Sequence, residues 1–200
     1  MTGDRELPGR DQALALLREY TTKPGLIQHA LAVEAAMRAH ADRLSGDRDA
    51  FGLVGLLHDF DYERWPSMED HPFRGSEILA ERGWPEWFRR AILAHAPHTG
   101  VRPDADIERC LFAVDELVGF VTACTLVRPD RSLRSLEVRS VRKRMKDRAF
   151  ARSVSREDIE AGARGIGMDL DEHIAFVIAA MRAVAPELGL DGAREPEAGA

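Results

Sequence analysis

Apolar residues recur every three or four positions along almost the whole chain, which is the spacing of one buried face of an α-helix. In the segment 26–44 this stripe consists of Leu26, Ala30, Val33, Met37, Ala41 and Leu44. In the segment 104–127 it consists of Ile107, Leu111, Val114, Val118 and Val121. No segment alternates polar and apolar residues as a half-buried strand would. The pattern therefore predicts an all-α fold, arranged as a single compact helical bundle.

Start and stop signals divide this pattern into separate helices. Pro72 is expected at a first helical position and Gly83 just beyond a last one, because proline suits the first turn and glycine readily adopts a positive φ. Ser155 followed by Asp158 resembles a capping box that begins a helix. The predicted helices span residues 11–20, 26–44, 49–60, 72–82, 85 to about 95, 104–127, 135–149, 156–165 and 170–185.

Length and composition limit the class of protein. The 200 residues, 44% of them hydrophobic, suit a single domain over 1–189, and the small polar tail 190–200 is expected to be disordered. The net charge of -6 disfavours a nucleic-acid partner. No apolar stretch approaches the ~18 residues of a membrane span, and the start of the chain lacks the apolar core of a signal peptide. We therefore expect a cytoplasmic protein with no membrane partner, in which Cys110 and Cys124 are buried free thiols.

Four polar residues interrupt the apolar helix faces. They are His29, the adjacent pair His58 and Asp59 after the run GLVGLL, and Asp115 inside LFAVDELVGF. Singly, each has a structural explanation, because a buried histidine is usually hydrogen-bonded and a buried aspartate is often half of a salt bridge. Together, two imidazoles and two carboxylates form the mixed nitrogen and oxygen set that Mn, Fe, Zn or Mg accepts.

The order of these residues resembles the H…HD…D signature of the HD-domain superfamily of metal-dependent phosphohydrolases. The stretch EDHPFRGSEIL is similar to the HP-x-x-G element that follows the HD pair in many members, and AILAHAPHTG is similar to a later histidine element. An HD dipeptide alone is weak, whereas the ordered set on an all-helical chain is specific. The resemblance covers roughly residues 24–127, which implies a metal-site core there, followed by C-terminal helices within 135–185.

The resemblance also implies a set of metal ligands. One divalent ion would be bound by His29, His58, Asp59 and Asp115. Asp59 would bridge to a second ion held by His71 and His95, so that the expected cofactor is one or two ions of Mn, Fe, Mg or Zn. Without the resemblance, His71 would be interpreted as a surface residue in a loop, whereas the spacing of His95 from Phe88, Ala91 and Ile92 directs it inward. His98 is expected at the rim of a pocket or on the surface.

The general acid or base is less well defined, because the chain departs from the family pattern after the HD pair. Many members continue as HD-I-G-K, whereas this chain reads HDFDYERW and has no lysine there. Nucleotidase-like members place a catalytic glutamate shortly after the pair, and neither Asp61 nor Glu63 matches that offset. We take Asp59 and Asp61 as catalytic candidates. Asp61 and Glu63 could instead orient water or the ligand histidines, or face solvent.

A basic segment follows the metal-site core, with the sequence RPDRSLRSLEVRSVRKRMKDRAFAR over residues 128–152. One interpretation is a phosphate clamp that binds the substrate through Arg139, Arg142, Lys143 and Lys146. The alternative is a solvated helix, because charge runs usually face water. A nucleic-acid surface is disfavoured, since Phe150 is the only nearby ring on which a base could stack.

These features favour a hydrolase of phosphate mono- or diesters that uses metal-activated water and a small, nucleotide-like phosphorylated substrate. An alternative is a non-catalytic HD domain that binds a nucleotide or a partner protein. A third hypothesis is a metal-dependent oxygenase on the same helical scaffold, which would need a di-iron site. The sequence does not predict the substrate's identity or the oligomeric state.

Overall fold

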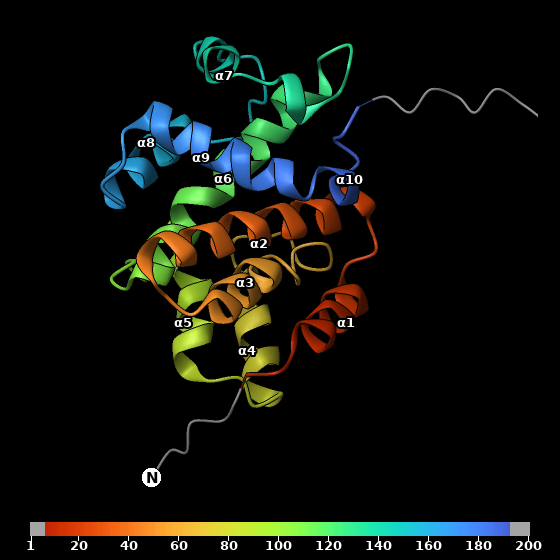
Figure 1. Ribbon diagram of the computed structural model, residues 1–200. Coiled ribbons are helices and arrows are strands. Elements are labelled where there is room, and N and C mark those ends of the chain that lie inside the picture. Colours follow the sequence, from red (N-terminus) through yellow and green to blue (C-terminus); the bar gives the residue numbers. More distant parts are fainter. Residues whose placement is uncertain (1–6, 193–200) are drawn as a thin grey trace, which may run out of the picture.

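The computed structural model describes residues 7–192 (Figure 1). Their regular structure is helical, with the short 3-10 helices η1 (Pro97–Thr99) and η2 (Leu133–Ser135) between α-helices. The α-helices are α1 (Arg10–Tyr20), α2 (Pro24–Leu44), α3 (Arg48–Leu57), α4 (Phe73–Glu81), α5 (Glu86–Ala94), α6 (Asp106–Leu126), α7 (Val138–Met145), α8 (Arg156–Gly165), α9 (Leu170–Ala183) and α10 (Ala185–Leu188). Within the described residues no strand forms beyond an isolated bridge between Ser132 and Asp191. The all-α prediction is confirmed.

Helices α2 and α6 lie at the centre of the bundle, with α3 against α2 and α8 against α6 (Figure 1). Two glycines allow the close approach of these pairs. A Cβ atom on Gly55 would lie 2.9 Å from Cγ of Met37 and 3.0 Å from the carbonyl oxygen of Val33. A Cβ atom on Gly162 would lie 2.6 Å from Cα of Ala113. The end of α3 and the middle of α6 are therefore held firmly against their neighbours.

Helix ends follow most of the predicted signals. The hydroxyl of Ser155 accepts a hydrogen bond from the amide of Asp158 at 3.1 Å, which confirms the predicted N-cap. Gly83 follows α4 with a φ of 80°, as expected of a residue that ends a helix. Two boundaries differ, because α3 ends at Leu57 instead of residue 60 and Pro72 precedes α4 instead of beginning it. The HD and HP pairs thus lie at a helix end and in a turn.

The basic segment forms a shorter helix than the predicted 135–149. The helix begins only at Val138, and the preceding residues Leu133 and Leu136 are buried outside it. Arg182 of α9 donates hydrogen bonds to the carbonyl oxygens of Leu133 and Leu136, at 2.8 Å and 2.6 Å. The Leu136 carbonyl group is satisfied by this side chain, and the Leu133 carbonyl group also accepts the amide of Leu136 at 3.3 Å in η2, so α7 begins only at Val138.

The first residue of the predicted tail is part of the folded structure. Leu190, the first residue of the expected disordered segment, is buried, and its carbonyl oxygen accepts a hydrogen bond from the amide of Leu133 at 2.9 Å. Burial of this leucine against the core fixes the chain up to that point. The rest of the predicted tail, residues 193–200, lies outside the described residues.

Cys110 and Cys124 are buried free thiols, as expected. In the part of the chain that the structure describes, no helix combines the length and apolar character needed to cross a membrane.

Candidate metal centre

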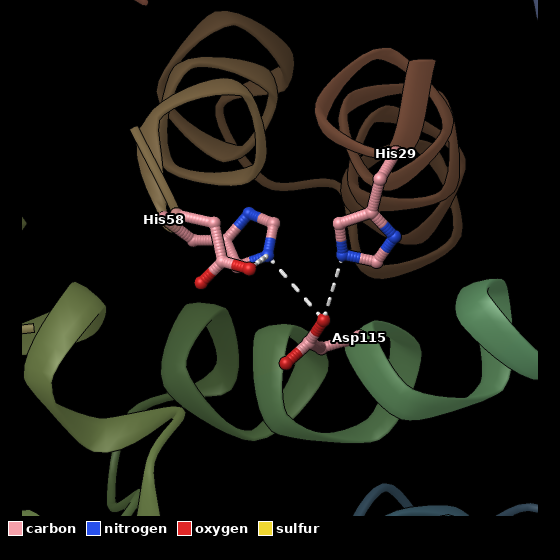
Figure 2. Close-up of side chains that lie close together, drawn as sticks. His29, His58 and Asp115 are labelled. Carbon is pink, nitrogen blue, oxygen red and sulfur yellow. Dashed lines mark hydrogen bonds and ion pairs between the residues drawn. The ribbon is translucent and has the colours of Figure 1, made fainter. Parts of the chain in front are cut away.

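Three helical elements bring a histidine or an aspartate to one point. His29 projects from α2 and Asp115 from α6, and Nε2 of His29 lies 3.0 Å from Oδ1 of Asp115 (Figure 2). His58, at the end of α3, places its Nε2 atom 3.3 Å from the same oxygen. The convergence that the H…HD…D order predicts is therefore present.

Asp59 joins this cluster to a second one. The ligand atoms of His29, His58, Asp59 and Asp115 all lie within 4.8 Å of one another, as do those of Asp59, His71 and His95. Oδ2 of Asp59 faces the first group, 3.5 Å from Nε2 of His58. Oδ1 faces the second group, 3.2 Å from Nε2 of His71 and 3.4 Å from Nε2 of His95. The carboxylate could thus bind one ion through each oxygen.

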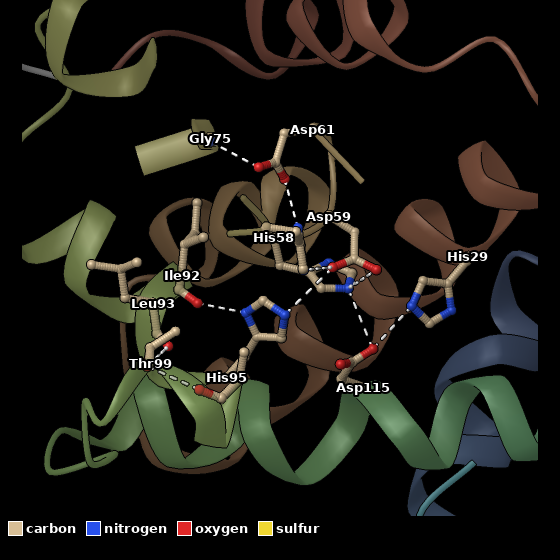
Figure 3. Close-up of polar contacts among 12 residues, drawn as sticks. His29, His58, Asp59, Asp61, Gly75, Ile92, Leu93, His95, Thr99 and Asp115 are labelled. Atoms are coloured by element: carbon tan, nitrogen blue, oxygen red, sulfur yellow. Dashed lines mark hydrogen bonds and ion pairs between the residues drawn. The ribbon is translucent and has the colours of Figure 1, made fainter. Parts of the chain in front are cut away.

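Hydrogen bonds on the outer side of three rings fix their orientation (Figure 3). Nδ1 of His58 donates to the carbonyl oxygen of Gly55 at 2.8 Å, and Nδ1 of His95 donates to that of Ile92. Nδ1 of His71 donates to Oδ1 of Asp61 at 2.8 Å. Because each Nδ1 carries the proton, each Nε2 can direct a lone pair toward the cluster, which is the arrangement that metal-binding histidines adopt.

The residues present fit a divalent ion. Nε2 of His58 is buried and has no hydrogen-bond partner within the described residues, so a polar atom is left without a partner where a metal would bind. The donor atoms are imidazole nitrogens and carboxylate oxygens, which suit Mn, Fe or Zn and, through the oxygens, Mg. Neither group contains a thiolate, the ligand typical of closed structural zinc sites.

Charges within the site oppose the effect of burial. Burial alone lowers the pKa of His58 and His95, but the carboxylates of Asp59 and Asp115 outweigh it and raise both pKa values. Burial alone raises the pKa of Asp59 and Asp115, but the neighbouring histidines, with His58 the largest contributor, together outweigh it and lower both. The carboxylates are held ionised and attract positive charge. A divalent ion would supply that charge in exchange for protons.

Asp61, predicted as a catalytic candidate, lies behind His71 and does not line the metal cavity. Its side chain is buried, with Oδ1 bonded to His71 and Oδ2 accepting a hydrogen bond from the amide of Gly75 at 2.8 Å. A Cβ atom on Gly75 would lie 2.9 Å from the Asp61 carboxyl carbon, so this position of the HP-x-x-G element must lack a side chain. Asp61 therefore orients His71. This is the alternative role that the sequence left open.

Glu63 lies near the surface, as the solvent-facing alternative expects, and belongs to neither ligand group. It accepts hydrogen bonds from the amides of Thr22 and Lys23, at 2.8 Å and 2.9 Å, and from the Thr22 hydroxyl. These bonds fasten the turn after the HD pair to the segment between α1 and α2.

A cavity of about 410 Å³ opens onto both ligand groups. Its wall also contains His98, as expected of a rim residue, and the carboxylates of Glu116 and Asp158. Burial, together with the charge of Asp115, raises the pKa of Glu116 to about 7. Among the residues that the structure describes, no lysine or arginine lines this cavity. The positive charge in this cavity therefore comes from its histidines or from bound ions.

The four basic residues predicted as a phosphate clamp lie away from the metal cavity, a position that favours the alternative of a solvated helix. None of Arg139, Arg142, Lys143 and Lys146 lines the cavity. Arg142 forms an ion pair with Asp171 at 3.0 Å, and Arg139 forms one with Glu137. The reason is the orientation of α7, which buries Val141 against its neighbours and leaves Arg139, Lys143 and Lys146 exposed.

Sequence reasoning missed Glu116 and Asp158 as cavity residues. Glu116 had a signal, since it is a second carboxylate beside Asp115 in an apolar helix. Asp158 had none, because its position depends on how α8 packs against α6.

The fold and the two ligand groups define an all-helical protein with a candidate two-ion metal centre. The family model described as HD domain matches residues 26–119, a segment that contains every residue of both ligand groups. Residues 26–119, just under half of the chain, therefore match the HD-domain family. Comparison with curated proteins gave no match, and comparison with solved structures gave none either.

Proposed function

We propose that this protein is a metal-dependent hydrolase of phosphate mono- or diesters with small, nucleotide-like substrates. The observation that carries the proposal is the carboxylate of Asp59, which belongs to both ligand groups and presents a different oxygen to each. Two ions held this way can bind a phosphoryl group between them. The match to the HD-domain family supports the same chemistry.

Ions bound here would supply an activated water and would neutralise charge on the phosphoryl oxygens. The chain's own residues hold and orient them. His29, His58 and Asp115 would bind one ion, and His71 and His95 the other. Because the rings are fixed by outer hydrogen bonds, they need little reorganisation during the reaction.

The charge of the cavity limits the substrate. Glu116 and Asp158 repel an anion, and no lysine or arginine lines the cavity within the described residues to offset them. Neutralisation of the substrate therefore depends on the ions alone. We infer a substrate with a single phosphoryl group at the site, an ester or diester rather than a triphosphate.

The test is a phosphoester panel on the purified full chain, supplied in turn with Mn, Mg, Zn and Fe(II). We expect metal-dependent release of phosphate from monoesters, or cleavage of diesters, that a chelator abolishes and re-added metal restores. Nucleoside triphosphates should be poorer substrates than the corresponding monophosphates. Binding of nucleotides without turnover under every metal would overturn the proposal and favour the non-catalytic alternative.

A further inference from the structure

A second cavity of about 270 Å³ adjoins the metal centre. It shares His29 and Gly119 with the first cavity, so the two meet at the imidazole of a metal-ligand candidate. Its walls come from α2, α6 and the segment around α10, which packs against α2 (Figure 1). A substrate bound at the metal centre would thus have a second space beside it.

Gly119 stands where the two cavities meet. It lies in the interior of α6, where glycine costs about 1 kcal/mol of helix stability relative to alanine. A Cβ atom at this position would meet no atom within 4 Å, so no packing contact requires glycine. Gly119 is thus destabilising for the helix, and its effect at this point is to leave the space between the cavities open.

We propose that the second cavity is a subsite for the organic group of the substrate, and that this group is a nucleobase with its sugar. This inference rests on the proposed function, since it places the phosphoryl group at the metal centre. A substrate extending past Gly119 would occupy both cavities at once. Pockets for small molecules are usually mostly apolar, with a few polar groups that fix the ligand's orientation.

The chemistry of the walls fits such a group. Leu126, Leu188 and Leu190 provide apolar surface. Gln28 adds a carboxamide and Thr122 a hydroxyl, each able to donate and accept hydrogen bonds at the edge of a base. No carboxylate lines this cavity among the described residues, in contrast to the metal cavity.

Arg131 completes the wall of the second cavity with an exposed guanidinium. A guanidinium plane can stack on a base or donate hydrogen bonds to it. The second cavity therefore contains the one arginine among the residues lining either space.

The first measurement is direct binding of the four common ribonucleosides to the full chain in Mg²⁺ buffer, detected by ligand-observed NMR. Nucleosides carry no phosphate, so their binding reports on the subsite independently of hydrolysis. We expect at least one to bind the wild type. Gly119→Leu should weaken that binding at least about tenfold because its side chain fills the junction, whereas Gly119→Ala should leave it nearly unchanged. Both substitutions favour the helix, so loss of folding is not expected.

A second variant tests the polar contact. Thr122→Val removes the hydroxyl with little change in shape, and loss of one hydrogen bond should weaken nucleoside binding roughly threefold to tenfold. Absence of nucleoside binding to the wild type, or equal binding to Gly119→Leu, would overturn the subsite.

Turnover distinguishes this inference from the proposed function. If the subsite is correct, Gly119→Leu should lower kcat/KM for nucleoside 5′-monophosphates at least about tenfold more than it lowers kcat/KM for methyl phosphate, which has no group to place there. Nucleoside binding that depends on Gly119, without hydrolysis of any phosphoester, would remove the proposed function and leave the subsite. Hydrolysis of both substrates with a kcat/KM that does not depend on the residue at position 119 would remove the subsite and leave the proposed function.

Discussion

Asp61 accepts a hydrogen bond from Nδ1 of His71 at 2.8 Å, on the side of the ring that faces away from Asp59. The opposite nitrogen, Nε2, lies 3.2 Å from Oδ1 of Asp59. His71 therefore stands between two carboxylates, one that orients it and one with which it could share an ion. This arrangement gives the second ligand group its own supporting residue.

Asp61→Asn should selectively weaken the binding of the second ion, the one that His71 and His95 would hold. Asparagine retains one oxygen acceptor but cannot offer a carboxylate to both His71 and Gly75, so the imidazole is held less firmly. Loss of such an orienting partner typically lowers metal affinity about ten- to a hundredfold. Calorimetric titration with Mn²⁺ checks this. The tighter of the two binding steps should be retained, and the weaker step should lose affinity.

The matched control is Glu63→Gln, which alters a nearby carboxylate whose bonds go to Thr22 and Lys23. Its Mn²⁺ titration should match that of the wild type. Equal weakening in both variants would mean that Asp61 acts through general stability rather than through His71.

Neutralising the basic helix should leave catalysis unchanged. Lys143 and Lys146 lie outside the metal cavity, so Lys143→Ala and Lys146→Ala should retain kcat/KM within about twofold at both low and high salt. Rates on the best substrate from the phosphoester panel provide the measurement. A loss that shrinks as salt rises would show that these cations steer the substrate after all.

The periodicity of the sequence was sufficient for the fold class and for nearly every helix, because a buried helix face repeats in the residues themselves. The convergence of His29, His58 and Asp115 was predicted from the resemblance to the H…HD…D signature together with the buried helix faces on which these residues lie. The role of Asp61 was left open, because it depends on a turn whose path is set by Gly75. The position of the basic segment relative to the metal cavity could not be predicted, because the contacts of Arg182 with distant carbonyl groups carry no local signal.

Close packing of α6 and α8 predicts opposite effects at two glycines of α8. Gly162→Ala should lower the free energy of unfolding by about 1–3 kcal/mol, because the new Cβ would lie 2.6 Å from Cα of Ala113. Gly165→Ala meets no atom within 4 Å and should be neutral or stabilising by up to about 1 kcal/mol. Urea denaturation of the two variants measures the difference. Equal stability would contradict the close contact.

Two buried histidines outside the metal centre predict a loss of stability in acid. His40 and His173 lie with ring centroids 5.5 Å apart, and their ring nitrogens have no hydrogen-bond partner within the described residues. Burial lowers the pKa of His40 to about 4, assisted by the charge of Arg43. Burial lowers the pKa of His173 to about 3, assisted by His40 and Arg43.

The direction in which stability changes with pH follows from these pKa values. Below pH 6.5 the unfolded chain takes up protons that the folded chain refuses, so stability is full above pH 6.5 and falls as the pH decreases toward 4. Each histidine contributes a slope of up to about 1.4 kcal/mol per pH unit. His173→Leu should flatten the dependence of unfolding free energy on pH, relative to the wild type, by one such slope. An unchanged slope would show that His173 is protonated in the folded protein.

The central claim is that one carboxylate, Asp59, serves two ions, and its most direct test is metal stoichiometry with activity in the wild type and in Asp59→Ala. We expect the wild type to bind two Mn²⁺ ions per chain and to hydrolyse a phosphoester. Asp59→Ala should retain its helical circular dichroism. It should lose binding of the second ion and bind the first ion more weakly, and its activity should fall by more than about a hundredfold. Full metal occupancy and undiminished turnover in Asp59→Ala would contradict the claim.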